Sequence, residues 1–115
     1  MKLLHYIDGN LSEKHSDINV KKIKKHKKYE FLLDNIMNYI YITDRLVFKR
    51  ETDEYIVEIN ICDKSSCKIY LKNENQELNI NVISSSYEEN VKYIDFKYIL
   101  ETDNKEHHII LEIGD

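Results

Sequence analysis

The sequence predicts a mainly β protein, an antiparallel meander that closes as a small β-barrel. The composition supports this prediction, since the chain has nine tyrosines, many isoleucines, no proline and no alanine, the best helix former. From residue 45 onward, apolar residues recur at every second position, which is typical of half-buried strands. A chain of 115 residues suffices for one core, so residues 1–115 are expected to form a single domain.

Successive runs of alternating residues define the expected strands of the second half. Residues 45–50 form the first run, and the polar "ETDE" separates it from the next strand. The inward-facing positions of the later strands are Tyr55, Val57, Ile59 and Ile61; Ile69 and Leu71; Leu78, Ile80 and Val82; Ile94, Phe96, Tyr98 and Leu100; and Ile109, Leu111 and Ile113. The segments "DKSS", "NEN", "SSYEEN" and "TDNKE" between them are short and rich in turn formers.

The segment "KYEFLLDNIMNYIYITD" supports two interpretations. As a short helix near residues 29–41, it would carry an apolar stripe, which gives the alternative fold class: α+β, with one helix on an antiparallel sheet. As a hairpin, it would turn at Asp34-Asn35, because both residue types tolerate positive φ. Residues 8–17 are expected to form a loop that begins with a turn at Asp8-Gly9.

A series of alternating strand segments covers about residues 40–113. It consists of "LVFKR", "EYIVEINI", "LNINVIS" and "IDFKYILETDNKEHHIILEI". It resembles the uncharacterised bacterial YwiB-like family, whose fold is a lipocalin-like (calycin) β-barrel. The positions that best match the family's polar features are Arg50 and Tyr98. Where that family carries a Thr-Pro-Tyr-Gly turn, this chain has "LKNENQELN". The resemblance therefore implies a barrel and brings no established activity.

The charge is unevenly distributed along the chain. The first 50 residues hold 11 Lys or Arg against 6 Asp or Glu, whereas residues 51–115 hold 6 against 15. The net charge is −4, while dedicated nucleic-acid binders are usually basic overall. No apolar run is long enough to cross a bilayer, and the first residues do not resemble a signal peptide. A cytoplasmic protein with no membrane partner is expected.

Six lysines fall within "VKKIKKHKK", residues 20–28. Such a run suits a solvated edge strand, because lysine blocks aggregation between sheets. It would also attract a protein partner, the protein's own acidic half, or, less readily, nucleic-acid phosphate. The candidate residues are Lys21, Lys22, Lys24, Lys25, Lys27 and Lys28.

Nothing in the sequence indicates catalysis, a metal site or a cofactor. Cys62 and Cys67 lack the additional ligand pair that zinc requires, and neither glycine belongs to a phosphate-binding loop. His107 and His108 are neighbours in an expected strand, so at most one of them faces any given site. Asp95 is expected on the solvated face, opposite to Ile94 and its apolar neighbours.

We therefore expect a non-enzymatic binding module for a small molecule or a partner. Tyrosine combines a large apolar ring with a polar hydroxyl group, which suits partly hydrated cavities and interfaces. The alternatives are a protein-interaction module, either a homodimer or an inhibitor of a host or phage factor, and a nucleic-acid-associated protein that uses the lysine run. The candidate ligand-binding residues are Arg50, Tyr98, Tyr39, Tyr41 and Tyr55.

Overall fold

A computed structural model describes residues 1–23 and 27–113, apart from the side chain of Ile23. These residues contain strands and turns but no helix, and therefore no helix that could cross a membrane. The strands are β1 (Lys2–Ile7), β2 (Asn10–His15), β3 (Lys21–Ile23), β4 (Lys27–Leu33), β5 (Ile36–Ile42), β6 (Leu46–Glu51), β7 (Tyr55–Ile61), β8 (Ser66–Leu71), β9 (Gln76–Ile80), β10 (Val82–Glu89), β11 (Tyr93–Leu100) and β12 (Glu106–Glu112).

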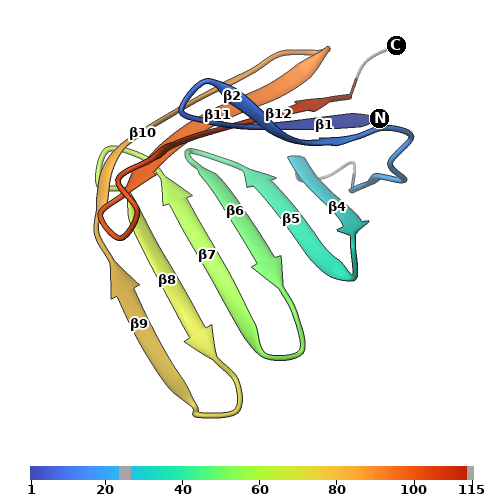
Figure 1. Ribbon diagram of the computed structural model, residues 1–115. Helices are drawn as coiled ribbons and strands as arrows, with labels where there is room; N and C mark the ends of the chain where they lie inside the picture. The colour runs from blue at the N-terminus through green and yellow to red at the C-terminus, as the bar shows by residue number, and fades with distance from the viewer. Residues whose placement is uncertain (24–26, 114–115) are drawn as a thin grey trace.

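The strands form two antiparallel sheets that pack face to face (Figure 1). The seven-stranded sheet is a simple meander from β3 to β9. The five-stranded sheet has the order β10-β11-β12-β1-β2, so the first strand of the chain pairs with the last. Neither sheet closes on itself within residues 1–23 and 27–113. The structure thus shows a mainly β antiparallel fold, and closure into a barrel stays a prediction.

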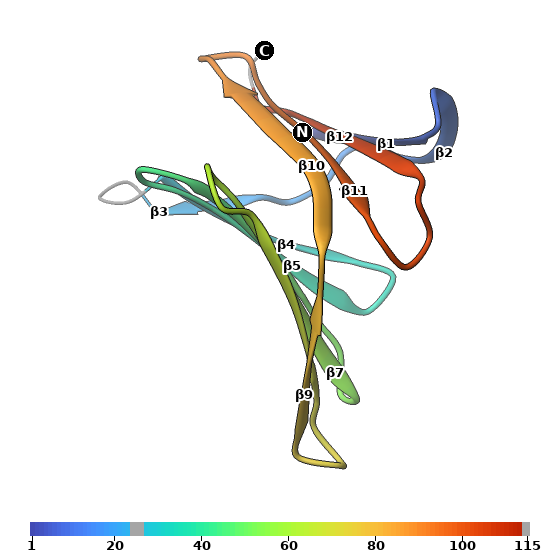
Figure 2. The same ribbon diagram turned by 90° about the vertical axis from the view of Figure 1, so that its left-hand side faces the viewer.

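The five-stranded sheet covers only part of the inner face of the seven-stranded sheet. Strands β7 and β9 extend beyond it at the end that carries the β6–β7 and β8–β9 turns (Figure 2). The core therefore lies between the covered halves of the two sheets. Its buried members are Leu3, Tyr29, Phe31, Leu33, Ile40, Ile42, Leu46, Phe48, Ile59, Ile61, Cys67, Ile94, Phe96, Tyr98, Ile109 and Leu111.

The segment with two interpretations is a hairpin, and the predicted helix near residues 29–41 is wrong. Strands β4 and β5 are joined by Asp34 and Asn35, whose φ angles are 48° and 67°. A two-residue hairpin turn that follows the twist of the strands needs positive φ at both positions, and Asp and Asn tolerate it. The residues of β5 alternate between the core and the solvent, as a strand requires, and Ile40 and Ile42 lie on the core face.

Three further expectations about local structure need correction. Residues 10–15 were expected in a loop but form β2, an edge strand that is exposed on both faces. The "SSYEEN" segment was expected to turn, yet Ser85–Glu89 lie in β10. The predicted strand through Leu78, Ile80 and Val82 is interrupted at Asn81, where the chain passes from one sheet into the other. The expected turn at Asp8-Gly9 is confirmed, with φ angles of 50° and 81°.

Candidate functional site

One row of side chains on the inner face of the seven-stranded sheet passes from the core to the uncovered end. Residues that are directly opposite in neighbouring strands share a face, so the strand registers define this row. In register order, the row consists of Phe31, Asn38, Arg50, Val57, Ile69 and Leu78. Phe31 and Asn38 are almost fully buried, Val57 and Ile69 are half-buried, and Leu78 is 40% exposed. The row thus joins a buried polar centre to an open apolar surface.

Arg50 occupies the centre of this row, where polar and apolar surroundings meet. Its guanidinium lies 6.0 Å from the centroid of the Phe48 ring. The Nε atom of Arg50 is buried and has no hydrogen-bond partner among the described residues. Within this part of the chain, no carboxylate lies within 4.0 Å of the guanidinium. A half-buried cation without a counter-ion is costly, so this arrangement needs an explanation.

A small pocket separates Arg50 from the five-stranded sheet. His5, Glu13, Asn38 and Arg50 supply its polar lining, together with apolar residues of both sheets. Its volume is about 10 Å³, close to the minimum that one water molecule needs. A larger ligand must therefore approach Arg50 from the uncovered side, next to Val57.

A chain of hydrogen bonds links the same pocket to the molecular surface. His5 Nε2 lies 3.0 Å from His107 Nδ1, and His107 Nε2 lies 2.7 Å from Asp103 Oδ2. The ring of Tyr98 stacks on His107, with 4.9 Å between the centroids and 9° between the planes. His5 is 8% exposed, whereas the side chain of Asp103 is 37% exposed. Three groups from β1, β12 and the turn before β12 thus connect the interior with solvent.

The electrostatic surroundings shift the pKa values of three groups in this cluster. Burial lowers the pKa of His5, and the nearby His107 and Arg50 lower it further, against the opposing effect of Glu13. Burial also raises the pKa of the Tyr98 hydroxyl far above its ordinary value. For Asp103 burial acts upward, but hydrogen bonds from His107 and from the Lys105 backbone lower its pKa overall.

The five predicted ligand-binding residues lie on two different faces of the molecule. Arg50, Tyr55 and Tyr98 project from the inner faces of β6, β7 and β11. Tyr39 and Tyr41 project from the outer face of β5, where their rings stack with 6.4 Å between centroids. The structure therefore brings Arg50 and Tyr98 into one cluster and separates both from the stacked tyrosine pair.

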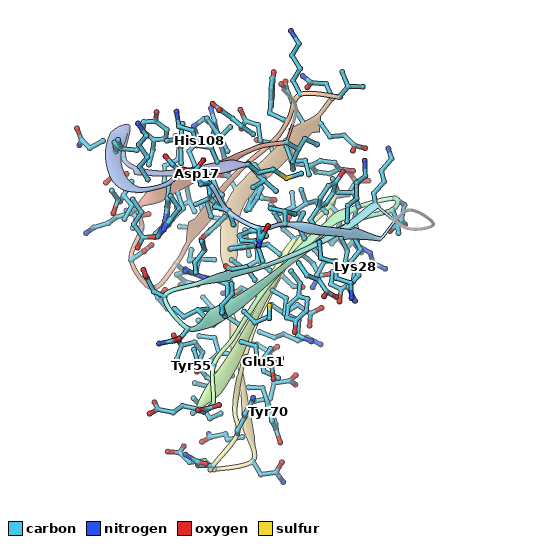
Figure 3. The ribbon with its side chains drawn as sticks, turned by 90° about the vertical axis from the view of Figure 1, so that its right-hand side faces the viewer. Asp17, Lys28, Glu51, Tyr55, Tyr70 and His108 are labelled. Carbon is cyan, nitrogen blue, oxygen red and sulfur yellow. The ribbon has the colours of Figure 1, made fainter. Side chains whose placement is uncertain are left out.

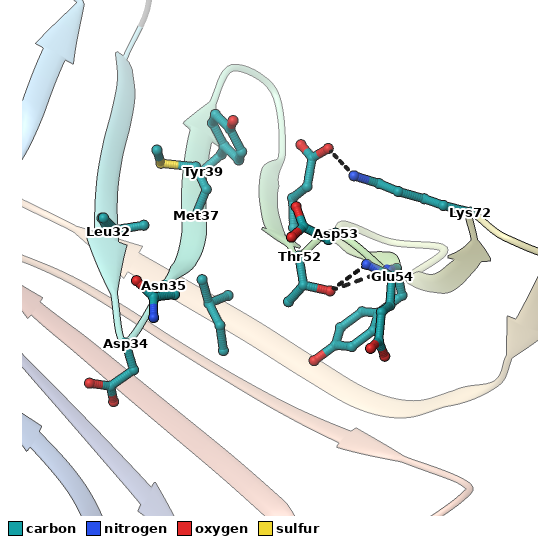
Figure 4. A pocket seen from close by; sticks show the side chains of 12 residues that line it. Leu32, Asp34, Asn35, Met37, Tyr39, Thr52, Asp53, Glu54 and Lys72 are labelled. Atoms are coloured by element: carbon teal, nitrogen blue, oxygen red, sulfur yellow. Dashed lines mark hydrogen bonds and ion pairs between the residues drawn. The ribbon is translucent and has the colours of Figure 1, made fainter.

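Tyr39 and Tyr55 also line an open cleft between two hairpin tips (Figure 4). The cleft has a volume of about 610 Å³ and lies between the β4–β5 and β6–β7 turns. Its single lysine, Lys72, donates a 2.7 Å hydrogen bond to Glu51. Because this ion pair satisfies the lysine, the cleft offers no unpaired cation comparable to Arg50, and the other charged side chains that line it are the carboxylates of Asp34, Asp53 and Glu54.

Lys21 and Lys22 lie on β3, which is the terminal strand of the seven-stranded sheet. This placement matches the expected lysine-rich edge strand. Lys27 and Lys28 begin β4, at the opposite end of the sheet from Tyr55 (Figure 3). Lys24 and Lys25 lie outside the described residues.

Both described lysines of β4 contact acidic groups of the protein itself. Lys27 Nζ lies 2.9 Å from Glu89 Oε1, in the acidic half of the sequence. Lys28 Nζ lies 3.0 Å from Glu30 and 4.7 Å from the centroid of the Tyr41 ring. These contacts reduce the positive potential that a phosphate backbone would meet.

The two adjacent histidines face opposite sides of the five-stranded sheet, as strand geometry requires. His107 belongs to the inner cluster, whereas His108 Nε2 lies 2.6 Å from Asp95 Oδ1 on the outer face. The structure confirms that Asp95 lies on the face opposite to buried Ile94. Both cysteines are free; Cys67 lies in the core, where burial raises the pKa of its thiol to about 11, while Cys62 is half-buried.

Sequence reasoning missed His5, His107 and Asp103 as members of one cluster. Alternation with buried Ile109 and Leu111 could have placed His107 on the inner face. His5 had no such signal, because apolar residues occur on both faces of β1. Comparisons with protein-family models, with curated proteins and with solved structures found no match for this chain.

Proposed function

We propose that this protein is a non-enzymatic binding module for a small amphipathic molecule with an anionic head group. The head group pairs with Arg50, and the apolar body lies along Val57, Ile69 and Leu78 on the uncovered inner face. The observation that carries the proposal is the half-buried guanidinium of Arg50, whose Nε has no hydrogen-bond partner and which has no carboxylate within 4.0 Å among the described residues.

Two physical arguments support this choice of ligand. A carboxylate, sulfonate or phosphate can accept two parallel hydrogen bonds from a guanidinium and would offset its desolvation. From Arg50 to Leu78 the row crosses three strand spacings, about 14 Å at ~4.8 Å each. An apolar chain of that length would cover side chains that are now partly exposed, which favours binding.

The proposal includes the lipocalin-like barrel and the kinship with the YwiB-like family. Arg50 and Tyr98, the two positions that matched that family best, lie close enough for the Arg50 charge to act on the Tyr98 hydroxyl. The two sheets would then be a barrel opened on one side, with the ligand on the open side. A cytoplasmic protein that binds a metabolite without converting it fits this arrangement.

Isothermal titration calorimetry with 1-decanesulfonate tests the proposal, with 1-decanol as the neutral control. We expect the sulfonate to bind more tightly than the alcohol. Arg50→Gln should weaken sulfonate binding about 10-fold or more, since hydrogen bonds to a charged group contribute about 1.5–3 kcal/mol. Arg45→Gln removes the chain's other arginine, which is exposed, and should leave binding unchanged. Equal binding of sulfonate and alcohol, or an unaffected Arg50→Gln variant, would exclude this function.

A second candidate function, protein interaction through a strand edge, is favoured by a different observation. Residues 78–86 carry no charge and lie on the terminal strands β9 and β10, with Leu78 40% and Ile83 55% exposed. The terminal strand β2 carries Glu13 and Lys14, and β3 carries Lys21 and Lys22, as protected edges do.

This candidate predicts a homodimer through the edge formed by β9 and β10. Ile83→Lys would then shift native mass spectra from dimer to monomer. Val91→Lys is the matched control, because Val91 is 88% exposed and lies in the turn between β10 and β11. A monomeric wild-type protein would exclude the dimer.

A further inference from the structure

The chain from Asp103 through His107 to His5 has the geometry of a proton path. With Asp103 as an acceptor, His107 donates from Nε2 and can accept at Nδ1 the hydrogen of His5 Nε2. An added proton can reside on the His5 ring or on the His107 ring. In both cases one hydrogen lies between His5 Nε2 and His107 Nδ1, which are 3.0 Å apart, and either nitrogen can be its donor. The pair can therefore exchange a proton with solvent through the partly exposed end at Asp103.

Several charged groups face the inner end of this path, at His5. Arg50 approaches from β6 and opposes a proton on His5, while Glu13 approaches from β2 and favours it. His107 on β12 also opposes a proton on His5, and Tyr98 on β11 stacks on the His107 ring. Among these groups, Arg50 is the one that the proposed ligand would neutralise.

We propose that the protein binds its anionic ligand together with a proton, which the His5–His107 pair takes up when the anion neutralises Arg50. This inference rests on the proposed function, and it adds a regulation of the same site. Thermodynamic linkage requires that affinity then increases as the pH falls. Proton and anion would be bound together and released together, so that a rise in pH weakens the binding of the ligand.

The size of the coupling between anion binding and proton uptake depends on how strongly Arg50 acts on His5, compared with the other groups around that ring. Burial is the largest influence on that ring and Arg50 the smallest of the four, so neutralising Arg50 shifts the equilibrium only in part. We therefore expect 1-decanesulfonate to bind a few-fold more tightly at about pH 5.5 than at about pH 7.5. The sulfonate keeps its charge over this range, so any pH dependence belongs to the protein.

Calorimetry at about pH 6.5, in buffers of different ionisation enthalpy, counts the protons directly. We expect uptake of a fraction of one proton per sulfonate bound. His5→Gln should abolish this uptake, whereas His108→Gln should retain it, because His108 faces the other side of the sheet. Asp103→Asn removes the carboxylate that favours a proton on the pair, so it should reduce the uptake, and it provides a second variant if His5→Gln does not fold.

The outcomes separate the two proposals. Sulfonate binding that depends on Arg50 but shows no proton uptake and no pH dependence would overturn the coupling and leave the binding function intact. Uptake that persists undiminished in both His5→Gln and Asp103→Asn would also overturn it. Absence of binding at both pH values would overturn the function and the coupling together.

Discussion

The rings of Phe48 and Phe96 lie 5.0 Å apart, centroid to centroid, and join the two sheets at the centre of the core. Phe48 belongs to β6 and Phe96 to β11, and both side chains are 3% exposed or less. The planes are inclined by 53°, a tilted arrangement that aromatic pairs favour. Arg50 follows Phe48 by two residues on the same face of β6, so this contact also positions the candidate site.

The first prediction concerns the contribution of Phe96 to stability. Phe96→Ala removes the inter-sheet contact and leaves a cavity, so it should lower the free energy of unfolding by about 3–5 kcal/mol. Phe96→Leu retains most of the volume and should cost less. Leu32→Ala is the control, because Leu32 is 56% exposed and should change stability little. Urea unfolding measures all three variants, and equal losses for Phe96→Ala and Leu32→Ala would contradict this view of the core.

The second prediction concerns the turn between β4 and β5. Asn35 has a φ of 67°, which a β-branched residue adopts only with strain. Asn35→Val should therefore lower the free energy of unfolding by about 1–2 kcal/mol. Asn73→Val, in the exposed turn between β8 and β9, is the matched control, since no positive φ is recorded at residue 73. Thermal unfolding compares the two variants, and a similar melting temperature for both would argue against the two-residue turn.

Most of the strands that the sequence predicted have one buried and one solvated face, although β9, also predicted, is exposed at all residues except half-buried Ile80. Alternation marked β7 and β11 because every second residue enters the core. Strand β2 gave no such signal, since it lies at the edge of its sheet and is exposed on both faces. The break at Asn81 was equally hidden, because apolar alternation continues through Ile80 and Val82 while the chain changes sheets.

The candidate site was predicted in part, through Arg50 and Tyr98, and its remainder depends on long-range pairing. His5 and His107 are separated by 102 residues, and only the pairing of β1 with β12 brings them together. Neither strand contains a motif that specifies the other as its neighbour. Local patterns can assign a side chain to a face, but they cannot say which strand lies opposite.

The third prediction concerns nucleic acid. Lys27 and Lys28 already contact Glu89 and Glu30, so a phosphate would have to compete with carboxylates of the same protein. We expect weak binding of labelled single-stranded RNA that Lys27→Gln, Lys28→Gln and Lys68→Gln reduce equally, as for any surface lysine. Fluorescence anisotropy at several salt concentrations measures this. A selective loss in the two β4 variants, with a steep salt dependence, would instead support a nucleic-acid-associated protein.

The fourth prediction concerns the dependence of stability on pH. The pKa of His5 is lowered in the folded protein, mainly by burial, from an ordinary value of 6.5. The unfolded chain therefore binds a proton that the folded protein does not, and the free energy of unfolding decreases as the pH falls below about 6.5. The lowered pKa values of Glu51 and Asp103 act in the same direction, but at more acidic pH, near the ordinary range of carboxyl groups.

Urea unfolding between about pH 5.5 and 7.5 isolates the effect of the histidine, because carboxyl groups stay ionised there. His5→Gln should flatten the decrease over this range, although the variant starts from a lower stability. His15→Gln is the control, since His15 lies on the exposed strand β2 and should retain the decrease. If the two variants lose stability on acidification to the same extent, His5 is not the group responsible. The pKa of His5 would then be the same in the folded protein as in the unfolded chain.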